Sequence, residues 1–245
     1  MRISTLLCAA ALVLPISPAF ADPVTAALAN PARGKDGDAD ARRHAAALAA
    51  FANVKPGDTV VDLIPGSGYF TRIFSLLVGP KGHVYAVWPT EYMKDDPDDV
   101  KLVEALAKDP HFANVTVLTQ PAGAFTVPAK ADLVWTSQNY HDYPDKFMGP
   151  TDTKVLNAAV FKALRPGGTY VVIDHVAAAG SGLRDTETLH RIDPAIVKSQ
   201  VLAAGFTLDS TSTALANPAD KHTAKVFDAS IRGKTDQFAF RFKKP

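Results

Sequence analysis

The sequence predicts an α/β fold: a Rossmann-like three-layer sandwich built on a mostly parallel seven-stranded sheet with an antiparallel C-terminal strand. Short apolar runs alternate with helical patterns from residue 40 onward, which is the order of parallel strands joined by crossover helices. The internal runs are apolar on both faces, as expected for strands covered by helices on each side. The last apolar segment differs, because Phe238, Phe240 and Phe242 alternate with other residues and predict a strand with one face in the core.

The first half of the chain contains three predicted strands and three helices. Alanine-rich residues 40–51 predict a helix, since alanine is the strongest helix former. The apolar run at Val60, Val61, Leu63 and Ile64 predicts the first strand. The remaining elements of this half are, in chain order, a helix over 69–78 that ends at a Gly-Pro-Lys-Gly turn, a strand over 84–88 that stops at Pro89, a helix over 98–108 and a short strand over 115–118.

The second half continues the alternation and then changes character. Residues 131–136 and 170–173 predict the fourth and fifth strands, and the helix between them, 152–164, repeats apolar pairs every four residues. Arg-Pro-Gly-Gly at 165–168 should end that helix. A helix over 193–204 and a polar-rich strand over 206–212 precede the final strand, which is expected to pair antiparallel from a C-terminal hairpin.

Residues 1–21 are expected to be a signal peptide. Arg2 precedes a short apolar run over 6–14, and Ala19-Phe20-Ala21 places small residues before a predicted cleavage site at Asp22. Cys8 is the only cysteine, so the chain after cleavage would form no disulfide, which favours a bacterial periplasm. Residues 22–39 are then a leader that lies across the domain or stays mobile, and 40–245 form one domain.

Charge and hydropathy narrow the expected partners. The 26 Lys and Arg residues balance 25 Asp and Glu residues, and removal of residues 1–21 takes away one positive charge. A balanced surface argues against binding to nucleic acid or to anionic membranes, and no later segment is long and apolar enough for stable membrane insertion. We therefore expect a small-molecule substrate, while the oligomeric state is unknown.

The loop after the first strand is the strongest functional signal. Pro65-Gly66-Ser67-Gly68 follows Asp62 and precedes a helix, so two glycines allow close approach of a ligand and the helix offers unpaired N–H groups. The segment resembles the first motif of class I S-adenosylmethionine-dependent methyltransferases, although Ile64 stands at the first of the three usual glycines. The resemblance implies that Gly66 and Gly68 lie under the methionine part of S-adenosylmethionine, with Asp62 supporting it. The alternative is a plain strand-to-helix turn.

Four segments extend the resemblance over roughly residues 40–245. They lie at 62–72, 139–142, 165–175 and 232–238, and together they resemble the exported, predicted methyltransferases of bacteria. The resemblance implies a carboxylate for the ribose at the end of the second strand, but Trp88 stands there. Glu91 could reach back to the ribose, or it could be a solvated residue at a helix start.

The loop after the fourth strand supplies the candidate catalytic residues. Asn139, His141 and Asp142 follow a strand whose carboxyl end faces the expected ligand side of the sheet. Asn139 would contact the cofactor, and His141 could act as a general base with Asp142 beside it. The alternative is a hydrogen-bonded histidine that holds the shape of the loop. Tyr69, Tyr140 and Tyr143 are further candidates, because their rings could face the sulfonium.

We expect no metal site, since His141/Asp142, Asp174/His175 and His190/Asp193 show no compact zinc spacing. The resulting hypothesis is methyl transfer from S-adenosylmethionine to an unidentified small-molecule or envelope acceptor in the periplasm. The alternative is a non-catalytic protein that binds a small ligand on the same scaffold. A dinucleotide-dependent oxidoreductase fits less well, because Thr71 replaces the third glycine of that fingerprint.

Overall fold

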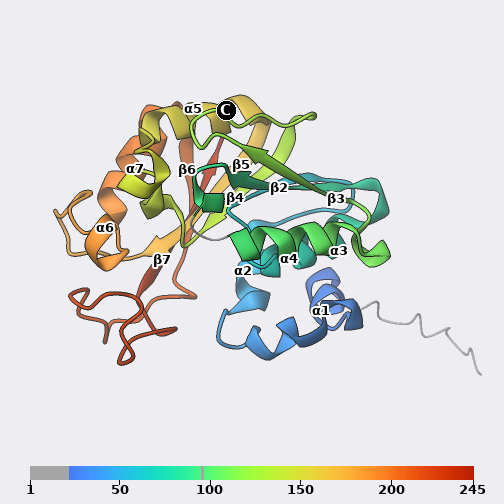
Figure 1. The fold of residues 1–245 in the computed structure, drawn as a ribbon, viewed down its shortest axis with the longest axis horizontal. Helices are drawn as coiled ribbons and strands as arrows, with labels where there is room; N and C mark the ends of the chain where they lie inside the picture. Colours follow the sequence, from blue (N-terminus) through green and yellow to red (C-terminus); the bar gives the residue numbers. More distant parts are fainter. Residues whose placement is uncertain (1–21, 95–96) are drawn as a thin grey trace, which may run out of the picture.

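The computed structural model describes residues 22–94 and 97–245, so the predicted signal peptide lies outside the described residues. One seven-stranded sheet has the order β3-β2-β1-β4-β5-β7-β6 (Figure 1). The strands are β1 (Thr59–Leu63), β2 (His83–Pro89), β3 (Val115–Gln120), β4 (Ala131–Ser137), β5 (Leu164–His175), β6 (Thr207–Ser212) and β7 (Gln237–Lys243). Only β7 runs antiparallel, to both β5 and β6, which confirms the predicted sheet.

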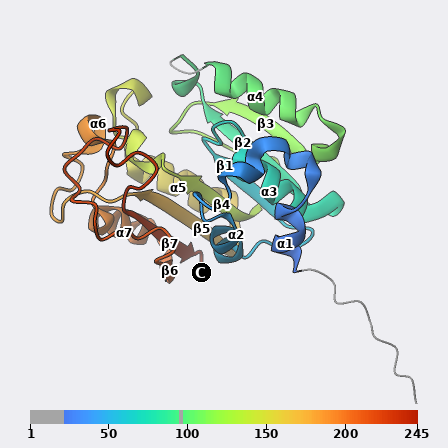
Figure 2. The same ribbon diagram turned by 90° about the horizontal axis from the view of Figure 1, so that it is seen from below.

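Helices cover both faces of the sheet (Figures 1 and 2). They are α1 (Pro23–Leu28), α2 (Ala45–Ala52), α3 (Tyr69–Val78), α4 (Pro97–Ala107), α5 (Thr153–Ala163), α6 (Thr186–Leu189) and α7 (Pro194–Ala203). Short 3-10 turns lie at η1 (Pro31–Ala39), η2 (Gly79–Lys81), η3 (Tyr92–Lys94), η4 (Pro110–Phe112), η5 (Tyr140–Asp142) and η6 (Lys146–Met148). Within the described ranges, no helix is long and apolar enough to span a membrane.

Two hydrophobic clusters, one on each side of the sheet, form the core. The side chains of α1, α2 and α3 pack in one cluster with Ala239 of β7, and those of α5 and α7 pack in the other with Phe238, Phe240 and Phe242. The expectation that only one face of β7 lies in the core was therefore wrong. Arg241 of β7 donates to the carbonyl oxygen of Phe51 in α2, so that helix covers the second face.

Two boundaries differ from the prediction. The helix predicted over 40–51 is α2, and it begins at Ala45 rather than at residue 40. Residues 40–44 instead form turns that end with His44 in a left-handed conformation. Strand β5 begins at Leu164, so Arg165–Gly168 belongs to the strand and carries a register shift against β4. Residues 22–39 form α1 and η1, which lie across α2 and α3.

Candidate functional site

The loop between β1 and α3 keeps a left-handed backbone at each of the three alternating positions where the resemblance expects glycine. Ile64 has φ +53°, Gly66 has φ +56° and Gly68 has φ +85°. A β-branched residue at positive φ is a clear outlier and costs about 1–3 kcal/mol of strain. Ile64 is buried, and its N–H donates to the carbonyl oxygen of Val87 in β2. Ile64 thus adopts, at a cost in strain, a backbone conformation that glycine adopts readily.

The two glycines of this loop face different surroundings. A Cβ added to Gly66 would meet one atom, Asp99 Oδ2, at 3.9 Å, so this position is open. A Cβ added to Gly68 would lie 2.9 Å from Leu106 Cδ1 of α4. Gly68 therefore permits close packing of the loop against α4, and it does not line the cleft beside the loop. Its predicted place directly under the cofactor stays a prediction, which its position behind the loop does not favour.

Asp62 supports the loop from beneath. It lies near the end of β1, is 2 % exposed, and accepts a hydrogen bond of 2.7 Å from Thr71 Oγ1 of α3. This bond ties strand to helix across the loop and gives Thr71 its role. Burial raises the pKa of Asp62 to about 7. The hydrogen bond from the Thr71 hydroxyl lowers this pKa, but by less than burial raises it.

Replacing Asp62 with asparagine should change how stability depends on pH. The unfolded carboxyl ionises near its ordinary pKa, whereas the folded one stays protonated up to about pH 7, so the wild-type protein loses stability as pH rises between these values. Between pH 4 and pH 7 the wild-type protein should therefore lose about 3 kcal/mol of unfolding free energy relative to Asp62→Asn. Urea unfolding across this range measures it. The exposed Asp98→Asn should show no comparable trend, and parallel curves for Asp62→Asn and wild type would contradict the prediction.

A cleft opens beside this loop, at the carboxyl ends of β1, β2 and β4. Five of the predicted cofactor residues line it: Asp62, Pro65, Gly66, Ser67 and Asn139. The other lining residues are Arg43, Ile64, Tyr69, Phe70, Trp88, Tyr92, Asp99, Trp135, Ser137 and Gln138. The buried indole Nε1 atoms of both tryptophans have no hydrogen-bond partner within the described chain. The cleft thus combines a glycine-containing loop with aromatic walls.

Asp99 lines the cleft together with Asp62, whereas Glu91 does not. Glu91 does not line the cleft, because its carboxylate accepts from the Thr90 hydroxyl and the Ala122 N–H. Asp99, in the first turn of α4, lies opposite Gly66. The sequence held no signal for this residue except its acidic type, because its approach to the loop depends on how α4 packs.

Residues 33–43 surround the side chain of Tyr69, which lines one side of the cleft. Arg33 forms two bonds to the carboxylate of Asp40, and the Tyr69 hydroxyl donates to the same carboxylate at 2.6 Å. The guanidinium of Arg43 lies 4.4 Å from the centre of the Tyr69 ring. One aromatic face that the sequence predicted for a sulfonium is therefore already covered. Tyr140 and Tyr143 are buried and do not line the cleft.

A second pocket adjoins the cleft and is rich in arginine. Arg43 and Gln138 line both, and the second pocket adds Arg42 and Arg232. Its other lining residues are His175, Val226, Phe227, Gly233, Thr235 and Gln237, none of them acidic. Burial lowers the pKa of His175 to about 4, so this histidine is neutral at physiological pH. The pocket therefore favours an anionic ligand.

His141 and Asp142 lie in a buried cluster beyond the cleft. His141 Nδ1 is 2.8 Å from Asp174 Oδ1, and its Nε2 is 3.1 Å from Asp142 Oδ1. Burial alone would lower the pKa of His141, but the two carboxylates raise it well above its ordinary value. A protonated imidazolium cannot accept a proton, so this geometry favours the alternative in which His141 holds the shape of the loop.

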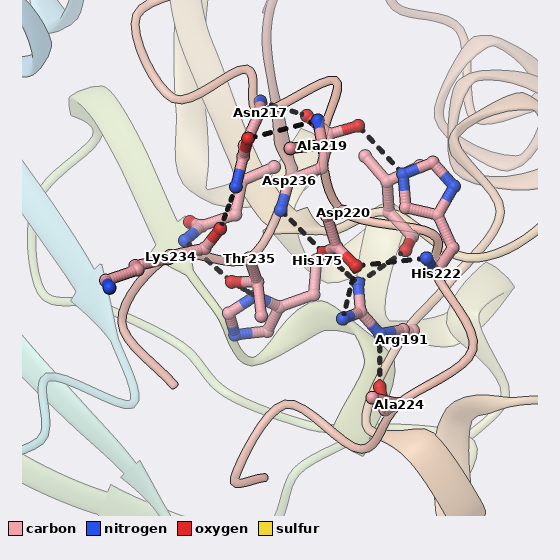
Figure 3. A network of polar contacts seen from close by, with 12 residues as sticks. His175, Arg191, Asn217, Ala219, Asp220, His222, Ala224, Lys234, Thr235 and Asp236 are labelled. Atoms are coloured by element: carbon pink, nitrogen blue, oxygen red, sulfur yellow. Dashed lines mark hydrogen bonds and ion pairs between the residues drawn. The ribbon is translucent and has the colours of Figure 1, made fainter. Parts of the chain in front are cut away.

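A buried arginine, Arg191, forms a separate polar network just after β5, and the sequence did not single it out for burial. Arg191 is 0 % exposed and donates to the carbonyl oxygens of Ala224 and Val176 and to the carboxylate of Asp220 (Figure 3). Asp220 also accepts from the N–H groups of His222 and Asp236. The same network includes His175, whose Nδ1 lies 2.8 Å from the Thr235 hydroxyl. These bonds fasten the long β6–β7 connection over the end of β5.

Among known proteins, one curated relative matches part of the chain. No family model matches the chain. It is 29 % identical over 121 residues to a protein-L-isoaspartate O-methyltransferase of Ignicoccus hospitalis, an alignment that covers 49 % of each protein. The chain thus spans about half the length of the curated relative it matches.

Solved structures resemble the chain over most of its length. A methyltransferase from Aquifex aeolicus that depends on S-adenosylmethionine has a TM-score of 0.59 at 16 % identity, covering 91 % of this chain and 99 % of its own. The [4+2]-cyclase SpnF has a TM-score of 0.61 at 16 % identity, covering 84 % of this chain and 81 % of its own. The glycopeptide N-methyltransferase MtfA, in complex with S-adenosylmethionine, has a TM-score of 0.52 at 16 % identity, covering 81 % of this chain and 86 % of its own. The fold is that of class I S-adenosylmethionine-dependent methyltransferases, and a cyclase shares it.

Proposed function

We propose that this protein transfers a methyl group from S-adenosylmethionine to a small anionic acceptor. The observation that carries the proposal is the left-handed backbone at Ile64 in the loop after β1. Strain of this kind persists where the surrounding structure and a ligand site require the conformation. The loop opens onto a cleft at the carboxyl ends of parallel strands, where ligands bind in open α/β sheets. The complex of MtfA with S-adenosylmethionine supports the same donor, and the likeness to the methyltransferase of Ignicoccus hospitalis supports methyl transfer.

The residues of the cleft fit the parts of this donor. S-adenosylmethionine, when bound, supplies an electrophilic methyl group on a sulfonium. The backbone of residues 64–67 can approach its polar groups closely, because a side chain at Gly66 would point into open space. Trp88 and Tyr92, with ring centres 5.5 Å apart, offer aromatic surface for the adenine. Asp99 offers a carboxylate that can accept hydrogen bonds from ribose hydroxyls.

The arginine-rich pocket supports an anionic acceptor. It joins the cleft at Arg43 and Gln138, so an acceptor bound there would lie next to the donor. Arg42 and Arg232 reach the pocket from the two ends of the chain, and fork-shaped guanidinium groups bind carboxylates and phosphates in pairs. Holding two reactants side by side is the main contribution that a methyltransferase scaffold can make.

The cellular location belongs to the proposal as well. The residues that support export are Arg2, the apolar run over 6–14 and the Ala-Phe-Ala pattern before Asp22. We infer a periplasmic protein that acts on a small molecule or on an anionic group of the cell envelope. Mass spectrometry of the N-terminus of the exported protein tests the location independently of the activity.

The alternative is a protein that binds a small ligand without turnover. The burial and raised pKa of His141 favour it, because an imidazolium held between two carboxylates cannot take a proton from an acceptor. The two functions separate in one experiment. Calorimetry with S-adenosylmethionine measures binding, and transfer of label from methyl-labelled donor to a periplasmic extract measures turnover. Binding without any labelled acceptor would establish the binding protein, and no binding of the donor would overturn both.

Asp99 and Glu91 provide a matched pair for the donor site. Asp99→Asn should weaken binding of S-adenosylmethionine about 10-fold to 100-fold, since one hydrogen bond to a charged acceptor contributes about 1.5–3 kcal/mol. Glu91→Gln should leave the affinity within about threefold of wild type. The Glu91 carboxylate does not line the cleft and accepts hydrogen bonds from the Thr90 hydroxyl and the Ala122 N–H. Calorimetric titration measures both. The reverse order of effects would return the ribose-binding role to Glu91.

A further inference from the structure

Three side chains from two segments of the chain converge with their donor atoms on one point. His141 Nε2 lies 3.3 Å from His190 Nδ1 and 3.1 Å from Asp142 Oδ1, and His190 Nδ1 lies 3.9 Å from the same oxygen. His141 and Asp142 are buried, and His190 is partly exposed. Among the described residues, these three form the one group of histidine, aspartate or glutamate side chains with donor atoms this close.

The spacing suits a single metal ion. Two donor atoms that bind a tetrahedral ion at about 2.1 Å are roughly 3.4 Å apart, and the three observed separations lie around this value. Two imidazole nitrogens and one carboxylate oxygen are a common donor set for zinc and for ferrous iron, and they leave at least one coordination position for water or another ligand. A hard ion such as Ca²⁺ would instead require mostly oxygen donors.

The outer shell of a histidine metal site is also present. Asp174 Oδ1 is 2.8 Å from His141 Nδ1, and Asp174 Oδ2 accepts from the backbone N–H of His141 at 2.8 Å. A carboxylate on the far nitrogen of a ligating histidine fixes the tautomer and directs the other nitrogen toward the ion. Asp174 is itself 0 % exposed at the end of β5, so it is a rigid positioning residue.

The segment that contains His190 is also fixed by specific contacts. His190 has φ +53°, a left-handed conformation, and the adjacent buried Arg191 anchors it to Val176 and Ala224. The ring of the exposed Phe227 packs 4.9 Å from that of His190. The Thr186 hydroxyl of α6 donates to Asp145 Oδ1 at 2.6 Å, and the Asp145 N–H donates to the Asp142 carbonyl oxygen, which joins the two segments. The buried Asp145 Oδ2 has no partner in the described chain.

We propose that His141, Asp142 and His190 bind one divalent transition-metal ion, with zinc as the probe, and that Asp174 positions His141 for it. The proposal does not depend on methyl transfer, because metal binding is measured directly. The competing arrangement has no ion, and a proton on His141 links the two carboxylates. The sequence could not reveal the site by spacing, since His190 lies 49 residues after His141.

The test uses the untagged full chain, stripped with a chelator and dialysed. Elemental analysis after incubation with Zn²⁺ should find one ion per chain, and Co²⁺ should give visible absorption bands typical of nitrogen and oxygen ligands in a low-coordinate site. His190→Ala should lower zinc affinity about 100-fold or more, because it removes one of three protein ligands. Asp174→Asn should lower it about 10-fold to 100-fold, as expected for an outer-shell carboxylate.

His111→Ala is the matched control. His111 also pairs with an aspartate, since its Nδ1 lies 2.8 Å from Asp109 Oδ1, but this pair is exposed, and among the described residues no third metal-binding side chain joins it. Zinc affinity and the cobalt spectrum should stay unchanged in this variant. Circular dichroism checks that each variant is folded. If a variant does not fold, the cobalt spectrum of the wild-type protein still tests whether the site binds a metal ion. Absence of zinc and cobalt binding by the wild type, or equal binding by His190→Ala, overturns the proposal.

Discussion

Replacing Arg191 with methionine should lower the free energy of unfolding by about 3–5 kcal/mol, the usual cost of removing one partner of a buried ion pair. The guanidinium is 0 % exposed, and its loss leaves the Asp220 carboxylate without its cation and the carbonyls of Val176 and Ala224 without this donor. Methionine retains much of the length of the side chain, so the effect reports the lost polar contacts more than a cavity. Urea unfolding monitored by circular dichroism measures it.

Arg184→Met is the matched control for this experiment. Arg184 pairs with Asp185 at 2.8 Å, yet its side chain is 67 % exposed. Exposed pairs of this kind contribute about 0–1 kcal/mol, because water screens the charges and the side chains lose little on separation. A loss in Arg191→Met no larger than that in Arg184→Met would show that the network of Figure 3 does not hold the β6–β7 connection in place.

Valine at Gly66 and valine at Gly68 should damage the protein in different ways. At Gly68 the new Cβ would meet Leu106 Cδ1 at 2.9 Å, in a backbone with φ +85°, so overpacking and strain should together cost about 3 kcal/mol or more. At Gly66 the side chain has room beside Asp99 but enters the cleft, so Gly66→Val should abolish measurable binding of S-adenosylmethionine, a loss of about 100-fold or more.

Thermal unfolding and calorimetry on both variants separate the two effects. Gly66→Val carries a strain cost of about 1–3 kcal/mol from its positive φ, so it should remain folded in the cold while it fails to bind. Gly66→Ala shares that strain with a smaller side chain and should retain part of the affinity. Normal affinity in a folded Gly66→Val protein would show that the loop is a strand-to-helix turn and nothing more.

The sequence was sufficient for the sheet because its signals are local. Apolar runs bounded by Gly and Pro mark the strands, and the structure confirms them to within a few residues except at β5. The start of β5 was missed because Arg-Pro-Gly-Gly is a turn signal that the pairing with β4 overrides through a register shift. The second face of β7 was missed because burial of Ala239 depends on where α2 packs, which no pattern within β7 encodes.

The site was predictable where one loop forms it and not where several elements meet. Pro65, Gly66 and Ser67 line the cleft because the strand-loop-helix unit fixes them together. Asp99, Arg191 and the approach of His190 to His141 arise from packing between distant segments, and neither spacing nor residue type indicates such contacts. The buried arginine is the hardest case, since a charged residue in a polar stretch ordinarily indicates solvent exposure.

The position of β7 determines the order in which the sheet can assemble. Strand β6 pairs only with β7, and β7 lies between β5 and β6 although it is the last strand in the chain. Until residues 237–243 dock, β6 has no neighbour and β5 presents an open edge. Pairings that wait for distant segments slow folding and leave intermediates that associate with one another. This half of the sheet is therefore complete only after the last strand of the chain has joined it.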